Sequence, residues 1–190
     1  QAAALDDLLL QAGNLVILES TSPVGATERV AELLAKARPD LSVPRRGNGV
    51  AGNAETRVHV AHCPERVLPG NILREIVEND RIVGGIDGPS TTAAVDFYSH
   101  FVSGELLATD SRTAELAKLV ENAYRDVNIA FANELSLISE RAGIDVWELI
   151  RLANHHPRVN ILQPGPGVGG HCIAVDPWFI VADYPDLARL

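Results

Sequence analysis

One long helical pattern divides this sequence into two parts. From Ser111 to about Arg141 the residues SRTAELAKLVENAYRDVNIAFANELSLISER predict a nearly uninterrupted helix, which Gly143 ends, and Asp145 caps the helix that follows. The long helix is apolar on more than one face, through Ile129, Phe131, Leu135 and Ile138. Such a helix generally packs against a partner as well as its own domain, so we expect residues 111–190 to form an all-helical domain that dimerises.

The first 110 residues alternate short apolar runs with helical patterns. Strands are predicted at residues 14–19, 58–62 and 81–86, and helices at residues 26–37, 71–79 and 91–101. Thr27 is the expected N-cap of the first helix. Strands that alternate with helices at this spacing indicate βαβ units and a parallel sheet, so residues 1–110 are interpreted as the C-terminal half of a doubly wound α/β domain.

Composition limits the partners of the chain. Lys and Arg number 16 against 25 Asp and Glu, and the net charge of −9 disfavours nucleic acid and anionic membranes as partners. No apolar run approaches the roughly 18 residues of a membrane span, and no secretory signal is visible, which favours a cytoplasmic location. Cys63 and Cys172 lack disulfide or zinc spacing, so we expect reduced thiols and no metal. The chain starts at Gln1 inside a helical pattern, which indicates an internal fragment.

The segment GPGVGGHCIAVDPWF carries the strongest chemical signal. Its glycines let the backbone approach a ligand closely, and Cys172 follows them at a predicted helix start. A helix N-terminus favours the thiolate, which could attack a carbonyl carbon, and Asp176 would lie one turn onward on the same face. The alternative is a small buried cysteine behind a structural glycine turn. The glycines around Cys172 favour the catalytic interpretation.

Lys118 and Asn122 are four residues apart on the predicted long helix, with Arg125 close by. A cation and an amide on one helix face can bind an alkoxide or an oxyanion. The same face could instead be an ordinary solvated one, and the spacing alone favours that interpretation because acidic residues surround the pair. These acidic residues are Glu115, Glu121 and Asp126.

Two loops that follow predicted strands supply further candidates, because doubly wound folds bind ligands there. Thr21 lies in STSPVGAT, and its alternative is an ordinary Ser/Thr capping turn. Glu65 lies in CPERVLPG, where it could position a water, and its alternative is a solvated Glu-Arg pair. The loop HHPRVN adds His155, His156 and Arg158, which suit phosphates or hydroxyls. A zinc site there is disfavoured because adjacent histidines seldom ligate one metal.

Together these segments resemble the UDP-glucose/GDP-mannose dehydrogenase family. The resemblance covers essentially the whole chain, from LVILESTSPVGAT through CPERVLPG and KLVEN to GPGVGGHCIAVDPW, in the same order and spacing. It implies part of a Rossmann-type NAD-binding domain followed by a long-helix dimerisation domain. Within the family, RDVNIAFANELSLI and NHHPRVNILQPGPGVGGHCIAVDPWFIV look most similar to the branch that oxidises UDP-N-acetyl-D-mannosamine.

The resemblance implies a four-electron oxidation of the C6 alcohol of a UDP-sugar to a carboxylate. Two NAD molecules would accept the hydrides, and Cys172 would hold the aldehyde as a thiohemiacetal and then as a thioester. Lys118 would act in proton transfer and oxyanion stabilisation, and Asn122 would assist it. Asp176 and Glu65 would order the hydrolytic water.

The resemblance also implies binding roles. Thr21 would lie near the nicotinamide of the cofactor NAD. The positions expected to hold the UDP-sugar are Arg66, Val67, Lys118, Asn122, Arg125, His156, Arg158 and Gly169.

The sequence departs from the family pattern in three ways. It lacks the Gly-rich βαβ unit that grips the NAD pyrophosphate, it lacks the C-terminal nucleotide-binding domain, and Pro69 stands where UDP-glucose enzymes carry a second glutamate. The activity is therefore expected of the full-length protein rather than of these residues alone. Two alternatives stay open: oxidation of UDP-N-acetylglucosamine or UDP-glucose by the same residues, and a non-catalytic fragment that only dimerises.

Overall fold

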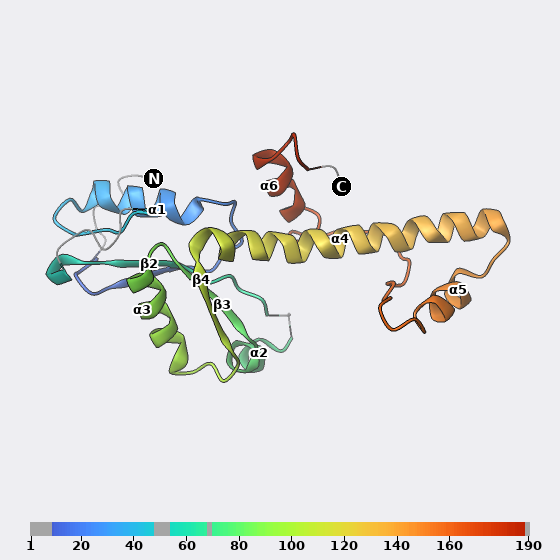
Figure 1. The fold of residues 1–190 in the computed structure, drawn as a ribbon, viewed down its shortest axis with the longest axis horizontal. Helices are drawn as coiled ribbons and strands as arrows, with labels where there is room; N and C mark the ends of the chain where they lie inside the picture. The colour runs from blue at the N-terminus through green and yellow to red at the C-terminus, as the bar shows by residue number, and fades with distance from the viewer. Residues whose placement is uncertain (1–8, 48–53, 68–69, 189–190) are drawn as a thin grey trace. The chain divides into compact units, whose positions relative to one another are not determined.

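The computed structural model describes residues 9–47, 54–67 and 70–188 (Figure 1). Packing divides the chain into a first unit, residues 1–118, and a second unit, residues 119–190. The division falls inside one helix, α4 (Ser111–Ala142), about two turns after its start. Two expectations lie outside the described residues: the predicted opening helix falls mostly on residues 1–8, and Pro69 belongs to the undescribed pair 68–69.

The first unit is built on a four-stranded sheet. Its strands, in spatial order, are β1 (Leu15–Leu18), β2 (His59–His62), β3 (Arg81–Gly85) and β4 (Leu106–Asp110). The β1/β2 and β3/β4 pairs are parallel, whereas β2 and β3 are antiparallel. The prediction of a parallel sheet was wrong for that one pair, because β3 starts at the same end of the sheet at which β2 stops. Strand β4 was not among the predicted strands.

Helices cover both faces of this sheet. The helices α1 (Ala26–Ala37) and α3 (Gly88–Ser99) lie on opposite faces (Figure 1). A third helix, α2 (Ile72–Glu78), lies in the connection between β2 and β3. One buried cluster joins α1 to the sheet through Leu34 and Val60, and a second joins α3 to the sheet through Ala94 and Ala61. Val60 and Ala61 are neighbours on β2, so the alternation of a strand sends them to opposite cores. The α/β class is confirmed.

The start of α1 differs from the prediction. Gly25 is the N-cap, and Thr27 lies inside the first turn, fully buried. The Thr27 hydroxyl donates to the Glu115 carboxylate at 2.5 Å, so it satisfies a side chain of another helix and not the backbone of its own. The assignment of Thr27 as N-cap was therefore wrong.

The second unit is helical. It contains most of α4 (Ser111–Ala142), together with α5 (Val146–Ala153) and α6 (Asp176–Asp183). Gly143 follows α4 with a φ of 69°, and the Asp145 carboxylate accepts a 2.8 Å hydrogen bond from the Trp147 amide at the start of α5. The predicted end of α4 at Gly143 and the predicted N-cap of α5 at Asp145 are both confirmed. None of the described helices combines the length and the apolar composition that a membrane span requires.

Candidate active site

The loop between β1 and α1 carries Thr21, which is partly buried. The loop ends at Gly25, whose φ of 91° is a conformation that glycine adopts without strain. Glu115 of α4 supplies the cap of α1, because its carboxylate accepts hydrogen bonds from the Gly25 amide at 2.6 Å and from the Thr27 amide at 2.7 Å. Glu115 is fully buried, so the interpretation of it as part of a solvated face was wrong.

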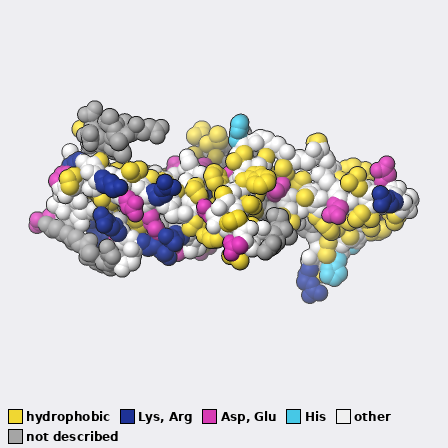
Figure 2. Space-filling model, turned by 90° about the horizontal axis from the view of Figure 1, so that it is seen from above, with side chains coloured by type: hydrophobic (Ala, Val, Ile, Leu, Met, Phe, Trp, Pro, Cys, Tyr) yellow, Lys and Arg dark blue, Asp and Glu magenta, His cyan; other side chains and the backbone are white. Residues whose placement is uncertain are grey.

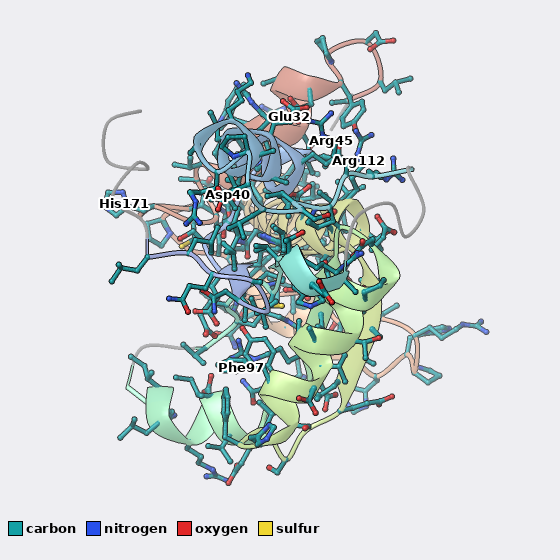
Figure 3. All side chains as sticks on the ribbon, turned by 90° about the vertical axis from the view of Figure 1, so that its left-hand side faces the viewer. Glu32, Asp40, Arg45, Phe97, Arg112 and His171 are labelled. Carbon is teal, nitrogen blue, oxygen red and sulfur yellow. The ribbon has the colours of Figure 1, made fainter. Side chains whose placement is uncertain are left out.

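A second contact ties the first turn of α4 to α1. Arg112, labelled in Figure 3, donates two hydrogen bonds to the Glu28 carboxylate, at 2.7 and 2.8 Å. The hydrogen bond from Arg112 holds the pKa of Glu28 below its usual value. The beginning of the helix that carries Lys118 is thus anchored to the helix that follows the Thr21 loop.

Glu65 closes a tight turn just beyond β2. Its Oε1 accepts hydrogen bonds from the amides of Arg66 at 2.6 Å and Val67 at 2.9 Å, so all three predicted residues belong to one local structure. Glu65 Oε2 accepts from the guanidinium of Arg81 at 3.3 Å. Glu65 is therefore held in a fixed turn, which differs from a freely solvated Glu-Arg pair.

Sequence reasoning missed Arg81. A signal was present, because Arg81 opens the apolar run RIVGGI, and an arginine at the start of a buried strand requires a partner. Its side chain is only 7% exposed and lies between Glu19 and Glu65.

The second unit brings Asn122 and Asp176 together, although 54 residues separate them. The Asn122 side chain donates a 2.5 Å hydrogen bond to Asp176 Oδ2, and Asp176 is only 4% exposed. Lys118 lies one turn before Asn122 on α4 and is partly buried. The spacing that suggested a shared helix face thus occurs on a continuous helix.

Cys172 lies in a turn that precedes α6. Its carbonyl oxygen accepts hydrogen bonds from the Val175 amide at 3.0 Å and from the Asp176 amide at 2.8 Å. The prediction that Cys172 begins the helix was wrong, because α6 starts four residues later, at Asp176. This turn nevertheless links Cys172 by a hydrogen bond to Asp176, whose carboxylate accepts the hydrogen bond from Asn122.

The two cysteines lie in opposite environments. Cys172 is exposed, whereas Cys63, which directly follows β2, is fully buried. Burial raises the pKa of the Cys63 thiol to about 11. A buried neutral thiol is a poor nucleophile at neutral pH. Of the two, only Cys172 suits nucleophilic catalysis.

The loop from His155 to Gly169 is mostly exposed, and the side chains of two asparagines hold it. The Asn154 side chain donates to the Ile161 carbonyl at 3.0 Å and accepts from the Ile161 amide at 2.8 Å, which closes the segment that carries His156 and Arg158. Asn133 of α4 accepts from the Gly165 amide at 2.8 Å.

Gly169 lies in open space. A Cβ atom there would meet no atom within 4 Å, so packing inside the described chain does not require this glycine. A backbone that a ligand approaches closely would require it.

The structure distributes the predicted residues over both units. The first unit carries Thr21, Glu65, Arg66, Val67 and Lys118, and the second carries Asn122, Arg125, His156, Arg158, Gly169, Cys172 and Asp176. Hydrogen bonds join Glu65 to Arg66 and Val67 in the first unit, and Asn122 and Cys172 to Asp176 in the second. In the part of the chain that the structure describes, no three His, Cys, Asp or Glu side chains gather as a metal site.

Comparison with known families now decides the relationship. The model of the NAD binding domain of the UDP-glucose/GDP-mannose dehydrogenase family matches residues 2–102, and the model of that family's central domain matches residues 112–188. The chain belongs to this family. The membership predicted from the order of the motifs is confirmed.

Individual relatives in the family are close in sequence. A UDP-N-acetyl-D-mannosamine dehydrogenase of Yersinia pestis is 63% identical over 182 residues, which cover 96% of this chain and 42% of the relative. An NDP-N-acetyl-D-galactosaminuronic acid dehydrogenase of Ralstonia nicotianae is 62% identical over the same shares. The chain therefore spans less than half the length of the curated relatives it matches.

Solved structures of family members share the fold. A UDP-D-ManNAc dehydrogenase from Pyrococcus horikoshii matches with a TM-score of 0.84 and 41% identity, over 100% of this chain and 42% of that one. An NDP-N-acetyl-D-galactosaminuronic acid dehydrogenase from Methanosarcina mazei matches with a TM-score of 0.80 and 34% identity, over 99% of this chain and 39% of that one.

Proposed function

We propose that the full-length protein oxidises the C6 alcohol of UDP-N-acetyl-D-mannosamine to the carboxylate, with two molecules of NAD as oxidants. The observation that carries this proposal is the joint placement of Asn122, Asp176 and the Cys172 turn by hydrogen bonds, in a chain 63% identical to a UDP-N-acetyl-D-mannosamine dehydrogenase. In this proposal residues 1–110 are the C-terminal part of the NAD-binding domain, and residues 111–190 are the central catalytic and dimerisation domain.

The chain's own residues fit part of an NAD site. The family's NAD binding domain matches residues 2–102, and the Thr21 loop follows β1, at the edge where doubly wound sheets bind ligands. The sequence has two G-x-G-x-x-G matches, at residues 47–52 and 165–170, but neither directly follows a described strand, so another part of the full-length protein would bind the pyrophosphate. When bound, NAD accepts one hydride in each oxidation step.

The proposed chemistry assigns one task to each residue. Lys118 holds the C6 oxygen and takes part in moving its proton, and Asn122 supports the oxyanion. The Cys172 thiolate adds to the aldehyde carbon, and loss of a second hydride leaves a thioester. Water then attacks the acyl carbon, the carbon–sulfur bond breaks, and the uronate and the free thiolate result. Glu65 and Asp176 order that water.

Substrate binding falls to cations and exposed backbone. Arg125, His156 and Arg158 are exposed and can donate to the diphosphate or to the sugar hydroxyls, and Gly169 leaves room for close approach. In the first unit, we assign Arg66 and Val67 to the same ligand. Because NAD and UDP-sugars are cytoplasmic metabolites, we also propose a cytoplasmic location.

We further propose that the protein is a homodimer joined through α4. In the second unit, α4 exposes an apolar stripe at Val120, Tyr124, Val127, Phe131 and Ile138, each 39% to 71% exposed. Steps of three, four and seven residues keep these side chains on one face of the helix. Hydrophobic side chains are visible on the molecular surface in Figure 2. A stripe of this length is typical of a helix that buries it against a second copy.

The activity is tested with the purified full-length protein, NAD and UDP-N-acetyl-D-mannosamine. We expect two NADH for each uronate formed and no free aldehyde. UDP-N-acetylglucosamine and UDP-glucose are tested as alternative substrates. A higher kcat/KM for either of them would show that the proposed substrate is wrong. No NADH with any UDP-sugar, from a protein that is dimeric by light scattering, would favour a purely structural role for this region.

A further inference from the structure

The start of α1 is held by a residue from another helix. Gly25, the N-cap of α1, has no side chain that could bind the first amides of the helix. The Glu115 carboxylate takes this place, because it accepts hydrogen bonds from the amides of Gly25 at 2.6 Å and Thr27 at 2.7 Å. The Thr27 hydroxyl donates a third bond at 2.5 Å. Glu115 is fully buried, and these bonds offset the cost of burying its charge.

His62 lies next to the first turn of α4. Val60 packs in the α1 cluster, so His62, two residues later on β2, projects from the same face of the sheet. The residue opposite His62 on β3 is Gly84, and a Cβ atom on Gly84 would lie only 2.5 Å from the Cβ atom of Ala114. The first turn of α4 therefore packs against the sheet beside His62, and Glu115 is the next residue of that helix.

The His62 ring is a buried polar group. It is fully buried, and neither ring nitrogen has a hydrogen-bond partner among the described residues. Burial lowers the pKa of His62 from the ordinary value of 6.5, and the negative charge of Glu115 opposes this lowering. A proton on the ring would need a partner or water, so the neutral ring is the form that fits the closed structure.

The other charged residues of the surrounding elements are engaged elsewhere. All the side chains that α1 buries are uncharged. Glu28 of α1 and Arg112 of α4 pair with each other nearer the surface, at 22% and 44% exposure. Glu19 and Arg81 both contact the side chain of a tyrosine of α3, on the opposite face of the sheet. The carboxylate of Glu115 is therefore the charged group that acts on the buried ring.

We propose that His62 and Glu115 form a proton-sensitive latch, which keeps the start of α1 attached to α4 at neutral pH and releases it in acid. In the open form the His62 ring reaches water and binds a proton more readily than in the closed form. Lowering the pH therefore shifts the equilibrium toward the open form, and raising the pH restores the closed form. The loop that carries Thr21 ends at Gly25, so its end is released together with α1. The latch does not depend on the proposed oxidation.

Amide hydrogen exchange in the full-length protein measures this opening. The reporters are the amides of Gly25 and Thr27, which donate to Glu115. Between pH 7 and pH 5.5 their protection, relative to intrinsic exchange rates, should fall by about 3-fold to 8-fold, the change that one histidine of lowered pKa supplies. The Ser90 amide is the internal control, because it donates to Asp87, the N-cap of its own helix, at 3.0 Å. Its protection should stay constant.

Two variants assign the effect to one ring. His62→Leu should abolish the pH dependence at Gly25 and Thr27. His59→Leu is the matched control, because His59 lies on the same strand but on the opposite face, so the dependence should persist. If His62→Leu does not fold, hydrogen exchange at the C2 carbon of His62 in the wild-type protein decides. A midpoint well below pH 6.5 supports the latch, and a midpoint at pH 6.5 or above overturns it.

Three further outcomes overturn the latch. One is protection at Gly25 and Thr27 that stays constant or rises as the pH falls. Another is an equal fall at Ser90, which would indicate that the whole unit unfolds. The third is a fall at Gly25 and Thr27 that persists in His62→Leu.

Discussion

Different interactions stabilise the two units of this chain. Both buried apolar clusters lie in the first unit, on the two faces of its sheet. Of the described residues of the second unit, only five are buried: Leu119, Ala132, Ser139, Ile150 and Asp176. Packing stabilises the first unit, whereas hydrogen bonds of Asn122, Asn133 and Asn154 hold the candidate catalytic segments of the second. The comparison indicates that the second unit exposes Cys172 and the apolar stripe of α4, and the proposed partner copy would cover that stripe.

Thiol reactivity gives the largest expected contrast between the units. At pH 8 a thiol with the Cys63 pKa of about 11 is ionised to about one part in 10³, and its side chain is also fully buried. Cys172 is exposed. We expect iodoacetamide to label Cys172 faster than Cys63 by a factor of about 10³ or more, measured by peptide mass spectrometry. Equal, slow labelling of both would remove the distinction and favour a structural role for Cys172.

Lys118 tests whether the last turn of the first unit takes part in chemistry. If its ammonium stabilises a developing oxyanion, Lys118→Ala should lower turnover by about 10²-fold to 10³-fold, with a much smaller effect on substrate affinity. Lys36→Ala, at an exposed lysine in the last turn of α1, is the control. Steady-state kinetics of Lys118→Ala within a small factor of wild type would identify Lys118 as an ordinary surface charge.

Matched truncations sharpen the difference in packing. Leu34 is 3% exposed in the α1 cluster, so Leu34→Ala should lower the free energy of unfolding by about 2 to 5 kcal/mol. Phe131 is 49% exposed on α4, so Phe131→Ala should change monomer stability by only about 0.5 kcal/mol but should weaken the dimer. Urea unfolding and sedimentation equilibrium measure the two effects. A Phe131 variant that dimerises as tightly as wild type would contradict the role of the α4 stripe.

The smallest effect concerns His62, a fully buried residue of β2. Burial lowers its pKa below the ordinary value of 6.5, and neither ring nitrogen has a hydrogen-bond partner among the described residues. Between the folded pKa and 6.5 the unfolded chain binds more protons, so the free energy of unfolding falls as pH falls through that window. We expect a loss of about 1 kcal/mol between pH 7 and pH 5.5.

His62→Leu should remove most of this pH dependence. The half-buried His59, whose pKa burial also lowers, would account for the remainder. Denaturant unfolding at the two pH values measures the difference. An unchanged pH dependence in His62→Leu would show that His62 does not titrate on unfolding.

Local patterns in the sequence predicted local structure well. The predicted bounds of α1 match the structure, and α4 extends one residue beyond its predicted end, because helical periodicity and the stop at Gly143 are properties of neighbouring residues. The strand β4 was not predicted, because its five residues, LLATD, include no fully buried apolar side chain. The order of the motifs was enough to predict the family.

Contacts between distant residues were not predictable in the same way. Glu115 appeared solvated among its acidic neighbours, yet its hydrogen-bond partners lie about 90 residues earlier in the chain. Arg81 meets Glu19 across 62 residues, and the antiparallel pairing of β2 with β3 is equally non-local. A single sequence gives no signal for which distant carboxylate an arginine will meet.

The covalent role of Cys172 is tested most directly by replacing its sulfur. Because a serine oxygen lacks the reactivity of a thiolate at neutral pH, Cys172→Ser in the full-length protein should abolish uronate formation from UDP-N-acetyl-D-mannosamine and NAD. Cys63→Ala, at the buried thiol, should retain it. Product analysis by mass spectrometry decides the matter: the account predicts no uronate from Cys172→Ser, and uronate at the wild-type rate from that variant would contradict it.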